Sequence, residues 1–273
     1  MMDMSTTSSA PRKMKAEPVV RLVDLHKRFR ELVVLDGADL ALKAGETTVI
    51  IGESGSGKSV LLNHIVRLLR PDRGEVYFHD LRIDNIPERE LAELRPRFGY
   101  LFQLSALFDS MTVGQNVAFP VVEHTRKDRG EIQQIVKQRL AMVGLDGIQS
   151  KWPAELSGGQ KKRVALARAI ALEPEVILYD EPTTGLDPPR ADEINELIIK
   201  LKRELAVTSV VVTHDMASAR KVADRIVMLY RGKFIFDGTP ESIERCEDAR
   251  VRCFVEGRCS PEVLRTLQAR ELI

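Results

Sequence analysis

The sequence predicts an α/β protein in which a mostly parallel sheet with crossover helices is interrupted by a helical subdomain. Three observations predict this class. Apolar runs of strand length alternate with amphipathic helical segments along most of the chain, as in βαβ units. A glycine-rich loop joins one buried strand directly to a helix. From about 104 to 174 the strands stop, and helix-spaced apolar residues predict an inserted subdomain.

The first elements are predicted from their periodicity. Residues 19–29 and 33–42 alternate partly between apolar and polar side chains across a polar turn, which predicts two strands. The run 47–52 is continuously apolar, as in a strand buried on both faces. Residues 58–69 follow the glycine-rich loop and are apolar almost all round, which predicts a helix, covered by protein, that stops before Pro71.

The middle and last parts follow the same logic. Two further strands flank an acidic helix, three helices fill the inserted subdomain, and strand and helix then alternate twice. An Arg-Gly turn between two β runs predicts a hairpin at 225–238, and Thr239-Pro240 predicts a short helix. In chain order the predicted segments are strands 74–80 and 97–103 around helix 87–95, helices 113–124, 130–145 and 156–172, strand 176–181, helix 191–206, strand 208–215 and helix 216–225.

Composition fits a folded protein and excludes several function classes. Of 273 residues, 44% are hydrophobic and 30% charged, which excludes a wholly disordered chain. Lys and Arg total 41 against 40 Asp and Glu, a net charge of +1, so no general positive field favours nucleic acid. No apolar run approaches the roughly 18 residues of a membrane span. We therefore expect any membrane role to depend on another subunit.

Both ends of the chain differ from the middle. Residues 1–18 are rich in Ser, Thr and Pro and lack an apolar signal region, which predicts a flexible tail. The extension 246–273 ends in a helix-like stretch, 263–273, that could pack on its own domain or on a partner. It also carries all three cysteines. Their odd number predicts free thiols in a reducing compartment, and their spacing matches no zinc pattern. They are Cys246, Cys253 and Cys259.

The strongest chemical signal is GESGSGKS, residues 52–59, which matches G-x-x-x-x-G-K-[ST] between a predicted strand and helix. Such a loop turns its N–H groups toward a phosphate, and the helix N-terminus adds positive charge. Lys58 would reach the β- and γ-phosphates, and the Ser59 hydroxyl would ligate Mg²⁺. The predicted ATP-binding residues of the loop are Gly52, Glu53, Ser54, Gly55, Ser56, Gly57, Lys58 and Ser59.

The strand 176–181 supplies the second half of a nucleotide site. Its apolar residues place Asp180 at the carboxyl end, where parallel sheets bind ligands. Asp180 is predicted to hold Mg²⁺, and Glu181 to orient or deprotonate the attacking water. Together the two motifs predict an ATPase that uses ATP and Mg²⁺.

The segment LSGGQ, residues 156–160, resembles the signature motif of ATP-binding cassette (ABC) ATPases, and the resemblance extends from about Val20 to Gly238. Gly185 departs from the pattern, because the family usually has alanine there, which slightly loosens the D-loop. Other residues stand at family positions: Phe29 as the aromatic that stacks on adenine, Gln103 as the Q-loop glutamine, Asp187 as the D-loop aspartate and His214 as the H-loop histidine.

The resemblance implies a P-loop NTPase fold, namely an ABC nucleotide-binding domain at 19–245 with a mixed sheet core, an antiparallel β subdomain and the inserted helical subdomain. It implies that two copies meet head to tail around two ATP, each held between the loop 52–59 of one chain and the signature of the other. One copy alone is expected to be inactive. The implied roles are catalysis by Glu181, His214 and Gln103, Mg²⁺ binding by Ser59, Gln103 and Asp180, and ATP contacts across the dimer by Leu156, Ser157, Gly158, Gly159 and Gln160.

The stretch FQLSALFDSMTVGQNVAFPVVEHT, residues 102–125, resembles the ATPases of bacterial phospholipid-trafficking systems, which serve Mce-type proteins and maintain outer-membrane lipid asymmetry. This resemblance implies the ATP-hydrolysing subunit of an ABC transporter, peripheral on the cytoplasmic face of the inner membrane. Its implied partners are an integral membrane permease docked near the Q-loop and an Mce-domain protein. No nucleic acid is expected among its partners.

Two alternatives stay open. Uptake cassettes share the TV-x-x-NVAFP portion, so an importer ATPase for a polar solute such as an amino acid is the second hypothesis. The third is a non-transport ABC protein of cell division or nucleic-acid metabolism. The chain has no second fused cassette and no coiled-coil insertion, and its charge is balanced rather than basic; all three observations count against this hypothesis. The basic run 161–163 is interpreted as a solvated helix face.

Overall fold

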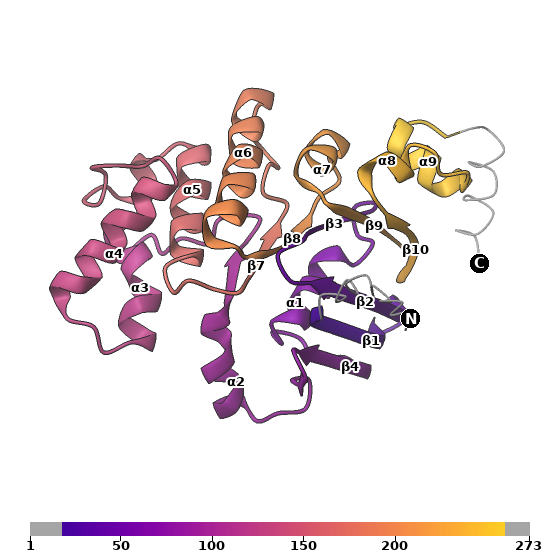
Figure 1. Ribbon diagram of the computed structural model, residues 1–273, viewed down its shortest axis with the longest axis horizontal. Helices are drawn as coiled ribbons and strands as arrows, with labels where there is room; N and C mark the ends of the chain where they lie inside the picture. The colour runs from indigo at the N-terminus through magenta and orange to yellow at the C-terminus, as the bar shows by residue number, and fades with distance from the viewer. Residues whose placement is uncertain (1–17, 260–273) are drawn as a thin grey trace, which may run out of the picture.

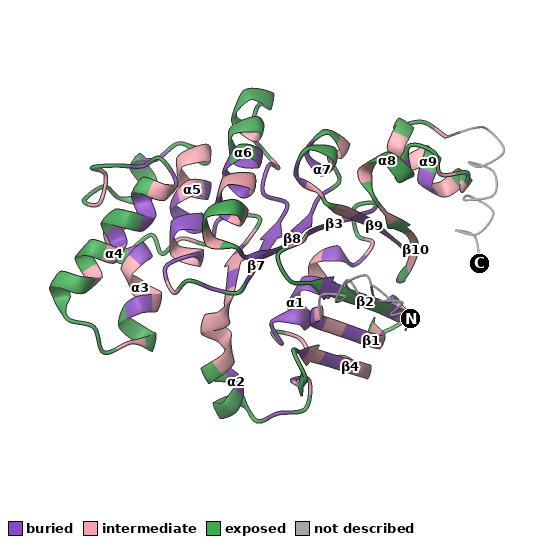
Figure 2. Cartoon of the chain, in the orientation of Figure 1, coloured by how far each residue is buried: buried purple, intermediate pink, exposed green. Residues whose placement is uncertain are grey.

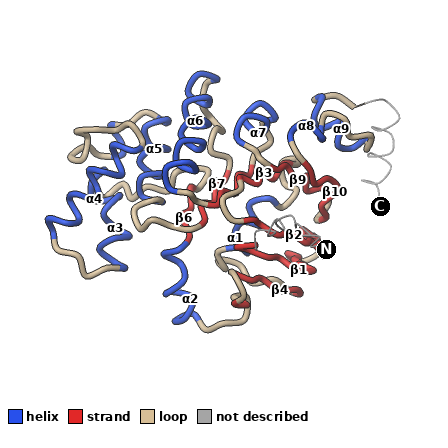
Figure 3. The backbone as a smooth tube through the Cα atoms, viewed as in Figure 1, coloured by secondary structure: helices blue, strands red, loops and turns tan. Residues whose placement is uncertain are grey.

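The computed structural model describes residues 18–259. The predicted tail, except for Pro18, and the helix-like stretch 263–273 lie outside the described residues. Figure 1 shows one group of helices at the left end of the molecule, a sheet through its middle and a second group of strands beside that sheet. Figure 3 separates the same elements by type.

The central sheet has six strands in the order β10-β9-β3-β8-β7-β6. All neighbours are parallel except β9 and β10, which form the predicted antiparallel hairpin. Every residue of β3, β7 and β8 is buried, which explains their largely apolar sequences. The polar residues among them are also buried: Thr47, Thr48, Asp180, Thr208 and Ser209. The strands are β3 (Thr47–Ile51), β6 (Phe98–Leu101), β7 (Val176–Asp180), β8 (Thr208–Val212), β9 (Arg225–Tyr230) and β10 (Lys233–Gly238). The predicted α/β class with a mixed sheet is confirmed.

A second, antiparallel sheet has the strand order β2-β1-β4-β5. Its strands are β1 (Pro18–Phe29), β2 (Leu32–Lys43), β4 (Arg73–Phe78) and β5 (Leu81–Arg82). The helix α1 (Lys58–Ile65) lies between the two sheets, and its buried Leu61, Leu62 and Ile65 share one apolar cluster with both. This packing fixes the glycine-rich loop that precedes α1.

Helix α1 is shorter than the sequence predicts. It ends at Ile65 rather than before Pro71, because Arg67 adopts a left-handed φ of 55°. The Arg67 side chain is buried and donates to the carbonyls of Asp84 and Ile86, at 3.3 and 2.8 Å. These tertiary contacts compensate for a conformation that costs a non-glycine residue about 1 kcal/mol.

The inserted subdomain is formed by α3 (Val113–His124), α4 (Arg129–Met142), a short 3₁₀ turn (Pro153–Glu155) and α5 (Gly158–Ala169). Each α-helix begins at a capping box that satisfies its first N–H groups, with Thr112, Asp128 and Ser157 as the N-caps. The subdomain lies at the left end of the molecule in Figure 1, beyond β7. Its position separates the N-terminus of α5 from the glycine-rich loop.

The remaining helices are α2 (Glu88–Leu94) with a 3₁₀ turn (Arg95–Arg97), α6 (Pro188–Leu205), α7 (Met216–Val222), α8 (Pro240–Ile243) and α9 (Ala249–Glu256). Helices α6 and α7 pack through buried apolar side chains, and Figure 2 shows their outer faces exposed while the central strands are buried. Within residues 18–259 no helix is long and apolar enough to span a membrane.

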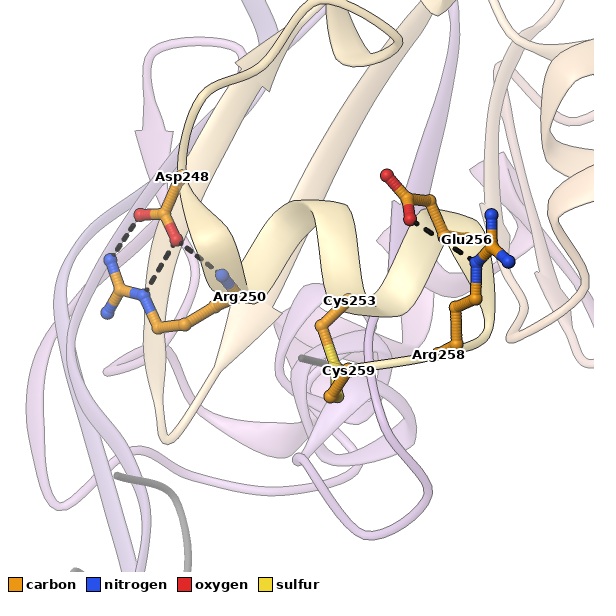
Figure 4. The surroundings of a disulfide bond; sticks show 6 residues. All are labelled: Asp248, Arg250, Cys253, Glu256, Arg258 and Cys259. Carbon is orange, nitrogen blue, oxygen red and sulfur yellow. Dashed lines mark hydrogen bonds and ion pairs between the residues drawn. A yellow bond between two sulfur atoms is a disulfide. The ribbon is translucent and has the colours of Figure 1, made fainter. Parts of the chain in front are cut away.

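The prediction of three free thiols is wrong for one pair, because the structure joins Cys253 to Cys259 in a disulfide (Figure 4). Helix α9 ends at Glu256, and its C-cap Gly257 has a left-handed φ of 65° that turns the chain back over the helix. This turn brings the two Cα atoms within 4.5 Å although six positions separate the residues. Cys246 is free and half-buried.

Candidate nucleotide-binding site

A cleft of about 440 Å³ opens where the carboxyl ends of several central strands meet the antiparallel sheet. It brings together most of the residues predicted to bind ATP or to act in catalysis. The lining residues are Phe29, Leu32, Val34, Ser54, Gly55, Gly57, Lys58, Ser59, Val60, Gln103, Glu181 and His214. Phe29 ends β1 and is 43% exposed beside this cleft, with the Lys27 ammonium 5.5 Å from the centre of its ring, so part of the ring is open to a planar ligand.

The glycine-rich loop closes around the ammonium group of Lys58. Its Nζ donates to the carbonyls of Gly52 and Glu53 at 2.8 and 2.9 Å. A side-chain carbon on Gly52 would lie 2.4 Å from the Leu229 carbonyl oxygen, so glycine is required there. Burial lowers the pKa of Lys58, and the charges of Glu181, Asp180 and Glu53 partly offset that effect.

The loop also leaves a helix N-terminus open for an anion. Gly57 is the N-cap of α1, has a φ of 100° and makes no side-chain cap. A side-chain carbon on Gly57 would lie 2.7 Å from Cγ1 of Val34, so this position also needs glycine. Without a side-chain cap, the first N–H groups of α1 are available to a phosphate.

Ser59 and Asp180 form the oxygen-rich part of the site. The Ser59 hydroxyl donates to Oδ1 of Asp180 at 2.8 Å. Burial raises the pKa of Asp180, against the lowering effect of the Ser59 hydrogen bond. Within the described residues no group of three or more His, Cys, Asp or Glu side chains could hold a metal alone. The hydroxyl, carboxylate and nearby Gln103 amide are hard oxygen donors that fit Mg²⁺ when it also binds phosphate oxygens.

Glu181 lies directly after β7 in a left-handed conformation, with a φ of 49°. Its N–H donates to the Val212 carbonyl of β8, which fixes this turn to the sheet. Its Oε2 accepts from the Thr184 hydroxyl at 2.9 Å and lies 2.9 Å from Nδ1 of His214. Thr184 was not among the predicted site residues, although it follows Glu181 by only three positions.

Lys162 corrects the interpretation of 161–163 as a solvated helix face. Its side chain is buried, with 5% of the residue exposed, and its Nζ donates to the carbonyls of Gln103 and Glu181. Helical spacing contained this signal, because Lys162 precedes the buried Ala165 and Leu166 by three and four positions.

The predicted signature and D-loop residues lie outside the cleft of their own chain. Ser157 caps α5 in a capping box with Gln160, Leu156 is buried, and Asp187 caps α6 by accepting from the Arg190 N–H. Side-chain carbons on Gly158 and Gly159 would lie 3.9 Å from Leu186 and Arg190. The N-termini of α5 and α6 therefore form one surface, and no signature residue lines the cleft.

Together, the strand, glycine-rich loop, helix and adjacent Asp-Glu pair define a P-loop nucleotide-binding protein. The family model described as ABC transporter matches residues 35–184, and the chain belongs to this family.

Similar proteins carry several names. The chain is 42% identical over 239 residues to the intermembrane phospholipid transport system ATP-binding protein MlaF of Haemophilus influenzae, covering 88% of this chain and 90% of that protein. It is 42% identical over 234 residues to the probable ribonucleotide transport ATP-binding protein mkl of Mycobacterium tuberculosis, covering 86% of this chain. The chain spans only 65% of the length of that mycobacterial protein.

The solved structures include a dimeric ATP-binding cassette in a post-hydrolysis state, bound to ADP and Pi. This chain is similar to it with a TM-score of 0.75 and 35% sequence identity, covering 81% of this chain and 98% of that one.

Proposed function

We propose that this chain is the ATP-hydrolysing subunit of a bacterial ABC transporter that moves phospholipid between membranes. The observation that carries the proposal is the 42% identity to a phospholipid-transport ATP-binding protein over 90% of that protein's length. The stretch 102–125, which resembles the same group, supports it. Residues 19–245 would form the ATPase domain, and 246–273 an extension to it.

The geometry of the cleft supports ATP hydrolysis by named residues. Lys58 and the N–H groups of the loop 52–59 would hold the phosphates, and Phe29 would stack on the adenine. Ser59, Asp180 and Gln103 would hold Mg²⁺, which neutralises charge on the phosphate oxygens when bound. Glu181 would accept a proton from the attacking water, and His214 would contact the γ-phosphate once ATP separates it from Glu181.

A second copy would complete each site. In one chain the signature and Asp187 lie at the surface formed by α5 and α6, away from the cleft. A head-to-tail dimer would place that surface over the partner's cleft and enclose two ATP, as a two-fold interface requires. The dimeric form of a similar cassette supports this assembly.

The permease would dock in a groove beside Gln103. This groove, of about 430 Å³, is lined mainly by aromatic and apolar side chains from β6, the loop after it and α3, and two arginines also line it. They include Phe98 and Tyr100 of β6, Phe102 and Phe108 of the loop after it, Phe119 and Pro120 of α3, Arg95 of the 3₁₀ turn before β6, and Arg168 of α5. Such a surface fits a short amphipathic segment of another protein. Docking there would hold the chain on the cytoplasmic face of the inner membrane, with an Mce-domain protein as a further partner.

Purification of the tagged chain from detergent-solubilised membranes, followed by mass spectrometry of bound lipid, tests the proposal. We expect an integral membrane subunit and phospholipid in the complex. The lipid assignment would be contradicted if the complex contained a membrane subunit but no phospholipid, and if a polar solute changed the ATPase rate of the complex. Recovery with ribosomes or DNA instead would contradict transport altogether.

A further inference from the structure

The helix that carries the signature also reaches the opposite side of the chain's own active site. Ser157 caps the N-terminus of α5, and Lys162 lies five residues further along, on the buried side of the helix. Its Nζ lies 3.2 Å from the Gln103 carbonyl oxygen and 3.2 Å from the Glu181 carbonyl oxygen. One ammonium therefore bridges the helical subdomain and two segments of the core.

Both carbonyls belong to backbone that lies beyond a strand end. Gln103 follows β6, and the loop after it holds Ser105 and Ala106 at φ values of 64° and 47°. Glu181 follows β7 at a φ of 49°, and its carbonyl otherwise accepts only a 3.3 Å bond from Thr184 N–H among the backbone donors described. Left-handed residues persist where surrounding contacts hold them, because the conformation itself is unfavourable.

A second cationic side chain of the same helix donates hydrogen bonds to the same loop. Arg168 donates to the carbonyls of Ser105 and Ala106, at 3.0 and 2.8 Å. Lys162 alone also reaches Glu181. Hydrogen bonds from charged donors are about twice as strong as neutral ones. Lys162 and Arg168, about two turns apart on α5, thus both donate to carbonyls of the segment 103–106. Lys162 also donates to the carbonyl of Glu181, the proposed general base.

We propose that Lys162 is a positioning residue that ties the Glu181 and Gln103 carbonyls to the signature helix, so that engagement of the partner's ATP by the signature sets the general base of the same chain. The inference rests on the roles proposed for Glu181 and for the signature. It makes each chain's hydrolysis depend on the ATP bound to the other chain, and so couples the two sites of the dimer.

The surroundings explain why a buried cation is retained here. Burial lowers the pKa of Lys162, and the negative charges of Glu181 and Asp180 partly offset that effect. A buried cation that only filled space would be replaced by an apolar side chain of similar volume at little cost, or with a gain in stability. The proposal therefore predicts a loss of turnover that exceeds any loss of stability.

The test compares three variants of the full-length protein in its purified complex. Lys162→Met keeps the length of the side chain and removes every donor, while Lys162→Gln keeps a neutral donor. Lys200→Met is the control, because Lys200 Nζ also donates to a backbone carbonyl, that of Met142 at 3.0 Å, but outside the cleft. ATP affinity, kcat, the Hill coefficient for ATP and Tm are measured for each.

Lys162→Met should lower kcat by about 10- to 100-fold, as misplacement of a catalytic group does, while ATP affinity stays within about threefold. Its Hill coefficient should fall to about 1, because the sites no longer communicate. The kcat and Hill coefficient of Lys162→Gln should lie between those of Lys162→Met and wild type. If Lys162→Met does not fold, Lys162→Gln alone tests the proposal. Lys200→Met should keep wild-type kcat and cooperativity.

A double-mutant comparison shows whether Lys162 acts through Glu181. In a Glu181→Gln background, Lys162→Met should slow single-turnover hydrolysis no further, because the group it positions is already disabled. Additive losses would overturn the proposal, as would unchanged kcat and Hill coefficient in Lys162→Met. Wild-type turnover in Glu181→Gln alone would instead refute the role of Glu181, a different failure.

Discussion

At the scale of single residues, the cleft concentrates buried charges that each have a partner. Lys58 donates to two loop carbonyls, Asp180 accepts from the Ser59 hydroxyl, and Lys162 donates to two carbonyls at strand ends. Burial shifts the pKa of each toward its neutral form, and the opposite charges of its neighbours partly counter that shift. Removing one of these charged groups leaves the buried charges of the others with less compensation from opposite charge.

Lys58→Ala should abolish useful nucleotide affinity. The variant removes the ammonium group of the loop 52–59 that is proposed to bind the phosphates, so we expect the Kd for a fluorescent ATP analogue to rise at least about 30-fold, roughly 2 kcal/mol. Lys200→Ala serves as the control for loss of a lysine elsewhere. Unchanged affinity in Lys58→Ala would refute the phosphate-binding role of the loop.

Glu181→Gln should separate binding from hydrolysis. The amide keeps the shape of the side chain and can still accept from Thr184, but it cannot take a proton from water. Steady-state ATPase should fall by about 10²- to 10⁴-fold with ATP affinity preserved. Glu193→Gln, an exposed carboxylate on α6, is the matched control. An ATPase rate near that of wild type in Glu181→Gln would contradict the assignment of Glu181 as the general base.

At the scale of elements, the sequence predicts what local periodicity controls. The strands β3, β7 and β8 are predictable because burial on both faces favours short runs of mostly apolar residues. The end of α1 was not, because a tertiary contact of Arg67 with the segment 84–86 stabilises its left-handed backbone. The disulfide is not predictable from the sequence for a similar reason: the turn at Gly257 brings Cys259 next to Cys253, and cysteine spacing alone does not indicate that turn.

The candidate site divides in the same way. Lys58, Ser59, Asp180 and Glu181 lie in motifs whose spacing reflects a loop or a strand end, and the structure places them together. Helical spacing indicates that Lys162 is buried, but its partners are backbone carbonyls, which no pattern of side chains in the sequence identifies. Contacts to backbone are decided by packing between elements.

An ion cluster joins the antiparallel sheet to the central sheet, and its contribution depends on pH. Glu175, just before β7, contacts Arg97, just before β6, and His79, just after β4. The hydrogen bond from Arg97, followed by that from His79, lowers the pKa of the Glu175 carboxyl below its ordinary 4.5. A lowered carboxyl pKa stabilises the fold above the ordinary value, and this contribution is lost as pH falls through the lowered one.

Glu175→Gln should therefore lower the free energy of unfolding by under about 1 kcal/mol at pH 7, since the group is partly exposed and screened. The difference between wild type and variant should shrink as pH falls below 4.5. Urea denaturation at pH 7, 5 and 4 measures it, with the exposed Glu90→Gln as control. A difference that grows on acidification would contradict the sign of the pKa shift.

At the scale of the whole molecule, the cleft and the signature surface of one chain lie apart, and the proposed function treats them as two halves of a nucleotide site. The cleft lies where the central strands meet the antiparallel sheet, whereas the signature belongs to the helical subdomain at the other end (Figure 1). An isologous dimer would use both halves of both chains. If Lys162 couples the signature to Glu181 as proposed, α5 also links the two halves within each chain. Hydrolysis in one site would then depend on the ATP bound in the other.

This arrangement can be tested by blocking one half only. In Ser157→Arg a long cation replaces the exposed N-cap of α5, so the signature surface can no longer close over a partner's nucleotide. Its own cleft contains no signature residue and should bind a fluorescent ATP analogue as wild type does. Light scattering with ATP and Mg²⁺ should show dimers for Glu181→Gln and lone copies for Glu181→Gln combined with Ser157→Arg. If the combined variant still dimerises, or if Glu181→Gln remains a single copy even beside its membrane subunit, the nucleotide is not enclosed between two chains.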